Sequence, residues 1–405
     1  MSLQGAMARG SDPAGARPGA VPFDSARLDE LLERAGIDVL IASSKHNVAY
    51  LLGGYRFFFF EFQDALGLSR YLPLFLYFRG HPERSVYVAN SMESWEADLG
   101  SIWSEIDAAA WGSEDAMLRA VRHLNAGGAK PIRIGVERAF LPADAESVLR
   151  QSVPQAEIVD ALAPLERLRA RKTPAELDCL REASVRVVDA MLAVFAGHGP
   201  GTTKRELVEA LKREEVQRGL VFEYCLIAAG ASHNRAPSEQ QWREGEVLSL
   251  DSGGNYRGYI GDLCRMAIMG EADSELQDLL ADVDAIQQAT RRPIRAGTIG
   301  GEVYAAAEEA IAKLPPRTDI RFAAHGMGLI AHEAPRLSNR APVPYPGEDA
   351  TRPLETGMVI SIETAIHHPR RGFIKLEDTV AVTDSGWEAF GDSGRGWNRG
   401  GTAQS

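Results

Sequence analysis

Four carboxylates and one histidine stand at strand-like positions in the second half of the sequence. The acids are Asp251, Asp262, Glu363 and Glu377, and the histidine is His325. Both glutamates interrupt strongly apolar runs, where an ionised carboxylate buried alone would be very costly. Four buried acids with one imidazole form the mixed oxygen and nitrogen donor set that two divalent cations bind. The residue types therefore predict a pair of metal ions.

Two predicted hairpins would bring these acids together. The turn-rich segment SGGNYRG joins the strand that carries Asp251 to the strand that carries Asp262. The segment HHPRRG joins the strands of Glu363 and Glu377 in the same way. Short polar, Gly-containing connections between strands are typical of hairpins. The four predicted strands are 246–254, 259–270, 358–366 and 373–383.

Two histidines seven residues apart, His325 and His332, lie in the segment AAHGMGLIAHEAP. This is not the helical HExxH zinc motif, whose histidines are four residues apart. Gly326 and Gly328 also disfavour a helix at this place. We expect the glycines to leave room for His325 to approach a metal closely, and His332 to face the substrate.

The elements that must position these residues divide into two predicted domains. In residues 21–165 helical and strand-like runs alternate, which indicates an α/β domain. Its first helix, 25–36, has Ser25 as a candidate cap and stops at Gly36. The strands expected here are 38–43, 85–90, 132–137 and 156–161.

The second predicted domain, 166–390, is an α+β catalytic domain. Thr173 can cap its first helix, Pro174 suits the first turn, and Glu176 completes a capping box. Further helices are expected at 203–219, 273–291 and 301–313, and a further strand at 226–231. With the two hairpins, these elements predict an antiparallel sheet with helices.

Composition limits the class of protein. The chain has 405 residues, 45% of them hydrophobic, and a net charge of -12, which argues for a soluble protein and against a nucleic-acid partner. The apolar stretch 71–78 is too short to span a bilayer. Residues 1–20 are expected to be a disordered leader and 391–405 a flexible tail. The three cysteines show no CxxC spacing, so a reducing cytoplasm is expected.

Taken together, these motifs resemble the creatinase, prolidase and aminopeptidase P branch of the pita-bread metallopeptidases. Residues 35–54 resemble the start of that family's N-terminal domain, and 169–184 resemble its hinge and first catalytic helix. The five predicted ligands occur in family order, in LDSGG, YIGDLCR, HGMG, ISIE and KLED. The resemblance implies a creatinase-like α/β domain followed by a pita-bread domain, in which helices flank a curved antiparallel sheet.

The resemblance also implies how the ligands share two cations. Asp262 and Glu377 would bridge them, Asp251 would hold one, and His325 with Glu363 would hold the other. Manganese is the first expectation for both cations, with cobalt, zinc or iron as alternatives. A bridging water, acidified by both cations, would attack an amide carbonyl as hydroxide.

Two residues would take part in the chemistry itself. Glu363 corresponds to the family's general base, which moves the proton of the attacking water. His332 corresponds to a histidine that touches the substrate and stabilises the oxyanion.

Several positions depart from the family pattern. Asn234 stands where a histidine is usual, so that either the adjacent His233 substitutes for it or the donor is lost. Cys264 replaces a threonine expected to support the bridging carboxylate. Arg352 is either a reader of a substrate carboxylate or a surface arginine. Lys375 replaces a second arginine, and either contacts substrate or is a buried partner of a ligand glutamate.

These features predict a dinuclear metal-dependent hydrolase that cleaves an Xaa-Pro or related amide bond in a dipeptide or short peptide. The alternative is a relative of the same fold that acts on a small metabolite, as an ectoine-type hydrolase or a metal-dependent lyase.

The run of four phenylalanines at 57–60 predicts either a hydrophobic strand or an interface segment. Since the N-terminal domain in this family often reaches the partner's active site, a homodimer is expected.

Overall fold

The computed structural model describes residues 20–401, except 63, 64, 66, 68, 69, 97, 98, 100, 101, 127–131, 316–318 and 339–346. The chain divides into two compact units, and the boundary in the sequence falls between Leu168 and Arg169. Apart from Ala20, the predicted leader lies outside the described residues. Within the described part, no helix combines the length and the apolar character needed to cross a membrane.

The N-terminal unit is built on a mixed six-stranded sheet in the order β4-β3-β2-β1-β5-β6. The strands are β1 (Val39–Ala42), β2 (Leu74–Phe78), β3 (His81–Asn90), β4 (Glu105–Ala110), β5 (Arg133–Val136) and β6 (Glu157–Asp160). The helices are α1 (Ser25–Ala35), α2 (Lys45–Leu51), α4 (Ser113–Ala126), α5 (Ala143–Ser152) and α6 (Leu162–Ala170). The predicted α/β architecture is confirmed. The cap of α1 is Asp24, whose side chain accepts the backbone N–H of Arg27, and not Ser25.

The run of four phenylalanines does not form a strand. It leads into a short 3-10 helix, η1 (Phe58–Phe62), in which the N–H of Phe60 bonds the carbonyl of Phe57 at 3.0 Å. Side chains three residues apart share a face of such a helix. Phe57 and Phe60 are therefore buried, whereas Phe58 remains 59% exposed. The sequence could not reveal this, because consecutive apolar residues carry no period.

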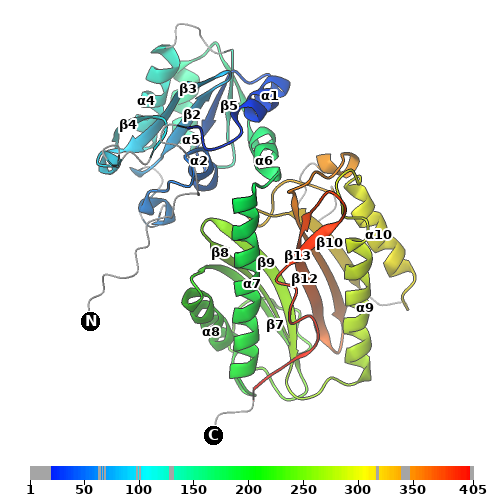
Figure 1. Cartoon of the computed structure of the whole chain (residues 1–405). Coiled ribbons are helices and arrows are strands. Elements are labelled where there is room, and N and C mark those ends of the chain that lie inside the picture. The colour runs from blue at the N-terminus through cyan, green and yellow to red at the C-terminus, as the bar shows by residue number, and fades with distance from the viewer. Residues whose placement is uncertain are drawn as a thin grey trace. The chain divides into compact units, whose positions relative to one another are not determined.

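The C-terminal unit contains an eight-stranded sheet with the main order β10-β11-β12-β9-β8-β7 (Figure 1). Its main strands are β7 (Val221–Ala229), β8 (Val247–Tyr256), β9 (Tyr259–Ile268), β10 (Ile320–Gly326), β11 (Val359–His368) and β12 (Gly372–Val382). The short strands β13 (Trp387–Phe390) and β14 (Asn398–Arg399) pair with β12 and β9. The helices are α7 (Pro174–Gly197), α8 (Lys204–Gln217), α9 (Ser274–Arg291) and α10 (Gly301–Ala312).

The predicted capping box at the start of α7 is present. The N–H of Thr173 donates to the Glu176 carboxylate at 2.7 Å, and the N–H of Glu176 donates to the Thr173 hydroxyl at 3.4 Å. Pro174 occupies the first turn, where its missing N–H costs nothing.

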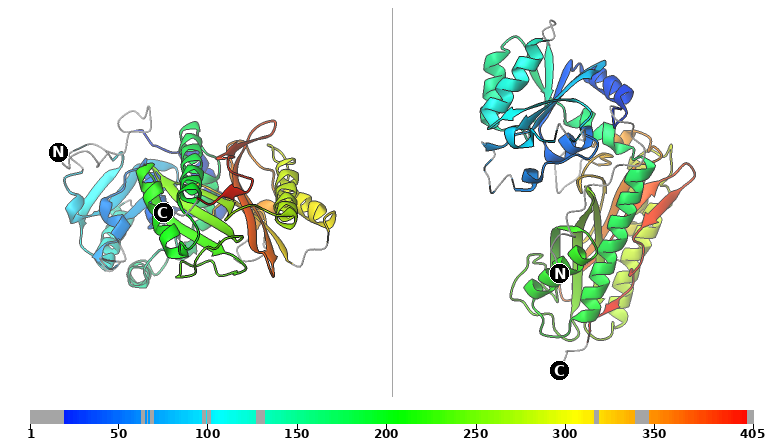
Figure 2. Two further views of the ribbon diagram at one scale, coloured as in Figure 1. Left: turned by 90° about the horizontal axis from the view of Figure 1, so that it is seen from below. Right: turned by 60° about the vertical axis from the view of Figure 1, so that its left-hand side comes forward.

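Helices cover one face of this sheet. A Cβ at Gly261 of β9 would collide with the backbone of Ala183 and Ser184, so α7 lies directly on the strand. Gln287 of α9 donates to the carbonyls of Ile362 and Leu376 on the other half of the sheet. Both helices run along the strands (Figure 2). The opposite face remains for the predicted ligands.

Residues 391–401, for which the sequence predicted a flexible tail, form hydrogen bonds with β9, the strand that carries Asp262. Arg265 of β9 donates to the carbonyls of Gly391 and Ser393, at 2.7 and 2.6 Å. Asn398 in β14 donates to the carbonyl of Met266 at 2.9 Å. These partners lie more than 120 residues apart in the chain, which local composition does not reveal. Residues 402–405 lie outside the described part.

Candidate metal centre

The strands β10, β11 and β12 place three of the predicted ligands on one face of the sheet. Glu363 pairs directly with Glu377, and His325 pairs with Ser361. Paired residues of antiparallel strands share a face, as do residues two apart on one strand. Ser361 and Glu363 are two apart, so the imidazole and both glutamates lie on the same side.

The strands β8 and β9 add the two aspartates to that face. Cys264 pairs with Asp251 on one side and with Glu377 on the other. Asp262 lies two residues before Cys264 and therefore points the same way. The predicted hairpins thus bring together side chains up to 126 residues apart. Three overlapping groups have possible ligand atoms within 4.8 Å of one another: Asp262 with His325 and His332, His325 with Glu363 and Glu377, and Asp251 with Asp262 and Glu377.

The glycines after His325 serve a different purpose from the one that the sequence suggested. A Cβ at Gly326 would collide with the backbone of Ala334, and one at Gly328 with the Glu333 carboxylate. The missing side chains therefore let the chain fold back on itself as it leaves β10. The expected room for a metal at His325 is not what these glycines supply.

Glu333 holds that returning segment. Its carboxylate is fully buried and accepts from Arg169 at 2.9 Å and from Lys172 at 2.9 Å. Burial raises the pKa of Glu333, but the charges of Lys172 and Arg169 outweigh it and hold the pKa below its usual range. The two ion pairs of Glu333 thereby fix the position of the neighbouring residue, His332. The His332 ring stacks on His325 with centroids 3.8 Å apart and planes 13° apart, and its side chain is exposed.

Lys375 lies among the acids rather than at the mouth of the site. Its Nζ is 2.6 Å from Asp251, 2.5 Å from Glu363 and 2.7 Å from Glu377, and the residue is 3% exposed. Of the two alternatives left open by the sequence, these contacts favour the buried partner of ligand carboxylates. Its ammonium balances part of the negative charge, but four acids outnumber it.

The donor set fits divalent cations. The Oδ1 atom of Asp262 and the Nε2 atom of His325 are buried, and neither has a hydrogen-bond partner among the described residues. His325 Nε2 is 3.6 Å from Glu377, which is beyond hydrogen-bond distance. A buried polar atom without a partner is costly, and a cation would satisfy both atoms. Oxygen donors with one imidazole suit manganese, iron, cobalt or zinc.

We expect cation binding to strengthen as pH rises. Burial raises the pKa of Asp251 to about 6. Burial opposes charge on His325, but Glu377 and Glu363 together raise its pKa to about 9. A metal needs an ionised carboxylate and a neutral imidazole, so it displaces a proton from each group that still holds one. Affinity should therefore increase with pH up to about pH 9, most steeply below about pH 6, where both groups hold protons. Calorimetry of metal-free protein in buffers of different ionisation enthalpy would measure the released protons; an affinity independent of pH would contradict the expectation.

Two residues that the sequence analysis missed also border the cluster. Tyr224 of β7 lies beside Asp262, and its ring crosses β8 where Gly253 has no side chain to block it. Burial, with the nearby carboxylates, raises the pKa of Tyr224, so the hydroxyl keeps its proton. Arg235 contacts the Asp251 carboxylate. Arg235 lies in an irregular loop after β7, so no helix or strand periodicity in the sequence indicates which way its side chain points. The glycine at position 253 was the only local signal for Tyr224.

The substrate-facing residues predicted around Asn234 and at Arg352 lie elsewhere in the unit. The Asn234 side chain accepts the N–H of Ala236, which closes the turn. His233 is exposed and lies against His367, with ring centroids 5.2 Å apart. His367 is four residues along β11 from Glu363, which corresponds to about 13 Å. Arg352 follows a short 3-10 helix, is half exposed, and pairs with Glu348 at 3.5 Å.

The side chain of Cys264 also contacts other groups than the sequence suggested. Its sulfur lies 3.2 Å from the Ser249 hydroxyl and 3.7 Å from the carbonyl of Lys375. The hydroxyl that supports the Glu377 carboxylate is instead that of Ser361, at 2.8 Å.

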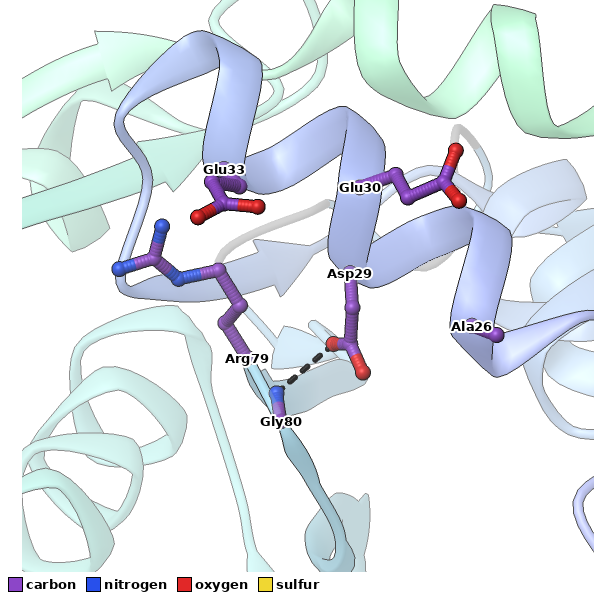
Figure 3. A pocket seen from close by; sticks show the side chains of 6 residues that line it. All are labelled: Ala26, Asp29, Glu30, Glu33, Arg79 and Gly80. Atoms are coloured by element: carbon purple, nitrogen blue, oxygen red, sulfur yellow. Dashed lines mark hydrogen bonds between the residues drawn. The ribbon is translucent and has the colours of Figure 1, made fainter.

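A separate hollow of about 300 Å³ lies in the N-terminal unit (Figure 3). Its acidic residue Asp29 accepts the N–H of Gly80 at 2.8 Å and the hydroxyl of Tyr77 at 2.9 Å. Arg79 pairs with Asp38 at 3.1 Å. The bonds of Asp29 tie α1 to β2 and to the turn that follows it, so the charges of Asp29 and Arg79 are accounted for without a ligand. The remaining lining residues are Ala26, Glu30 and Glu33.

Comparison with known proteins agrees with this architecture. The model of metallopeptidase family M24 matches residues 178–384, and the model of the creatinase/prolidase N-terminal domain matches residues 25–171. The probable dipeptidase PepE of Mycobacterium tuberculosis is 30% identical over 228 residues, which are 55% of this chain and 58% of that protein. An Xaa-Pro dipeptidase of Lactobacillus delbrueckii subsp. lactis is 24% identical over 385 residues, 90% of this chain and 95% of that protein.

A solved structure supports the fold. The Xaa-Pro dipeptidase from Bacillus anthracis superposes with a TM-score of 0.76 at 23% sequence identity, covering 93% of this chain and 98% of that one. The predicted fold class, a creatinase-like domain with a pita-bread domain, is confirmed.

Proposed function

Because the chain belongs to metallopeptidase family M24, we propose that it is a dinuclear metal-dependent hydrolase that cleaves the Xaa-Pro bond of a dipeptide or short peptide. The observation that carries this proposal is the convergence of Asp251, Asp262, His325, Glu363 and Glu377 on one face of the sheet, with two buried donor atoms unsatisfied. The name of the Lactobacillus relative, an Xaa-Pro dipeptidase, supplies the substrate class.

The residues divide the work as follows. Asp251, Asp262, His325, Glu363 and Glu377 would hold two divalent cations, whose chemistry would be to acidify a water and to polarise the carbonyl under attack. Glu363 is the most accessible of the four acids, with a side chain 24% exposed, and is placed to hold the proton released by that water. His332 stacks above His325 at the exposed side, where its imidazole can donate to the oxygen of the attacked carbonyl.

Lys375 and Ser361 keep the donors in place. Ser361 donates to Glu377, and Lys375 contacts Asp251, Glu363 and Glu377, so these three carboxylates are oriented before a cation arrives. Oriented supporting groups of this kind tune affinity for a metal.

The proposal includes manganese as the cation, the cytoplasm as the compartment and a homodimer as the assembly. Cys179, Cys225 and Cys264 are free, which suits a reducing compartment. Phe58 and Trp95 in the N-terminal unit are 59% and 76% exposed, and in the proposed homodimer the second copy covers them.

The test is hydrolysis of a series of Xaa-Pro dipeptides by manganese-loaded protein. The release of free proline measures the reaction. We expect turnover with at least one member, and none after removal of the metal by a chelator. Dipeptides without proline serve as matched controls for specificity. Failure to cleave any Xaa-Pro substrate at full metal occupancy would reject the proposal.

The alternative is a hydrolase or lyase of a small metabolite on the same scaffold. The observation that favours it is the loss of the expected histidine: Asn234 is used in a turn and does not replace it. A screen of metabolites containing C–N bonds, with the same metal-loaded protein, would distinguish this alternative from a peptidase.

A further inference from the structure

The ammonium of Lys375 stands at the point that a cation shared by three of the acids would need. Lys375 lies two residues before Glu377 on β12, so its side chain is on the face of the ligands. Its Nζ atom is 2.6 Å from Asp251, 2.5 Å from Glu363 and 2.7 Å from Glu377. An ammonium has three N–H donors, and here each has one carboxylate. A divalent cation bound to the same three carboxylates would take the place of the ammonium.

Two of the five donors are left out of these contacts. The Oδ1 atom of Asp262 and the Nε2 atom of His325 are buried and have no hydrogen-bond partner among the described residues. Of the three groups of possible ligand atoms in the described part of the chain, only Asp262 with His325 and His332 has no member that Lys375 contacts.

Glu377 lies between the ammonium and these two donors. Its Oε2 atom faces Lys375 at 2.7 Å, whereas its Oε1 atom is 3.6 Å from the Nε2 atom of His325. One carboxylate oxygen therefore serves the ammonium while the other borders the donors that the ammonium leaves free. A cation at Asp262 and His325 can bind without moving Lys375.

A second cation has to displace the ammonium, and burial opposes that exchange. Lys375 is 3% exposed, and a buried ammonium that loses its carboxylates is costly unless it reaches water or another partner. The backbone of β12 also tethers the ammonium, which keeps its local concentration high at all times. Both effects lower the affinity of the second cation and leave the first nearly untouched.

We propose that Lys375 is a tethered competitor for the second of the two cations. The first cation binds at Asp262 and His325 with the ammonium in place. The second binds only when it displaces the ammonium from Asp251 and Glu363. This inference specifies the two-cation centre on which the proposed function rests: the chain holds one cation when metal is scarce and two when metal is abundant.

Titration of manganese chloride into the metal-free full chain tests the order of binding. Calorimetry counts the cations, and electron paramagnetic resonance separates an isolated Mn²⁺ ion from a magnetically coupled pair. We expect wild type to show one tight site with the spectrum of an isolated ion, and a second site weaker by at least about 10-fold whose filling produces the coupled spectrum. Two sites of equal affinity, or a coupled pair before the first site is full, would overturn the inference.

Lys375→Met removes the competitor. We expect the affinity of the second site to rise by about 10- to 100-fold relative to the first, so that the coupled pair forms at a lower metal concentration than in wild type. The matched control is Lys313→Met, on an exposed lysine paired with Glu309, which should titrate as wild type does. An unchanged ratio of the two affinities in Lys375→Met would contradict the inference.

Two ligand variants assign the sites and keep the test decisive if Lys375→Met does not fold without metal. Asp251→Asn should weaken only the second site and keep the tight isolated ion. His325→Gln should remove the tight site. The reverse pattern, with the tight ion lost in Asp251→Asn and kept in His325→Gln, would overturn the order of binding.

These measurements use no substrate, so they fail independently of the proposed function. Ordered binding without cleavage of any Xaa-Pro dipeptide would reject the substrate class and support the role of Lys375. Cleavage by a chain with two equal sites would support the function and overturn the inference. Absence of manganese binding in wild type would overturn both.

Discussion

Replacing Glu377 by glutamine is expected to lower kcat/KM by at least about 10³-fold, equivalent to about 4 kcal/mol of transition-state stabilisation. Glu377 pairs with Glu363 across β11 and β12 and lies 3.6 Å from the His325 imidazole. It belongs to two of the three groups of possible ligand atoms. Glutamine keeps the shape but removes the charge that holds a cation, so the bound metal should fall as well.

Elemental analysis of the purified variant would measure the cations per chain, and steady-state kinetics would measure the activity. The matched control is Glu388→Gln on the adjacent strand β13, where the side chain is half exposed and pairs with Arg181. That variant should keep both metal and activity. If Glu377→Gln retained two cations and wild-type turnover, the assignment of this cluster as the catalytic centre would be wrong.

The hairpins and their ligands were accessible from the sequence because each is local. A short polar turn joins each pair of strands, and a period of two places Asp251 and Asp262, or Glu363 and Glu377, on one face. The start of α7 was equally readable, since a capping box lies within four residues.

The features that the sequence did not reveal depend on contacts across long separations. The strand β10 carries His325, but its identity is fixed by pairing with β11 about 40 residues later. Arg235 becomes part of the site only because its loop folds back over β8. The role of residues 391–401 likewise follows from Arg265, a partner 126 or more residues away. No local period encodes such contacts.

The second large effect is expected at Asp378, next to Glu377 but on the opposite face of β12. Its carboxylate is 1% exposed, lies 3.1 Å from Arg265 and 3.1 Å from Arg291, and also pairs with Arg395. Asp378→Asn leaves buried guanidiniums without this charge, which costs about 3–5 kcal/mol of stability when one partner of a buried pair is removed. The loss of electrostatic stabilisation should be largest at Arg265, because this side chain is fully buried and Asp378 is its acidic partner.

The expected measurement is a fall in Tm of about 6–20 °C, at 2–4 °C per kcal/mol for a unit of this size. The matched control is Glu271→Gln, which breaks an exposed pair with Arg399 and should change stability by less than about 0.5 kcal/mol. A variant of Asp378 as stable as this control would show that the arginines need no buried partner.

The pH dependence gives an independent check on the same group. Burial raises the pKa of Asp378, but Arg265, Arg395 and Arg291 outweigh it and hold the pKa below its usual range. A carboxyl with a lowered folded-state pKa contributes stability that is complete above its unfolded pKa of about 3.9 and is lost as pH falls through the folded value. Wild-type protein should therefore lose more stability than Asp378→Asn below about pH 4, and their unfolding free energies should converge. Since both chains keep all other acids, a constant difference between them down to the lowest pH would assign the stabilisation to packing rather than to charge.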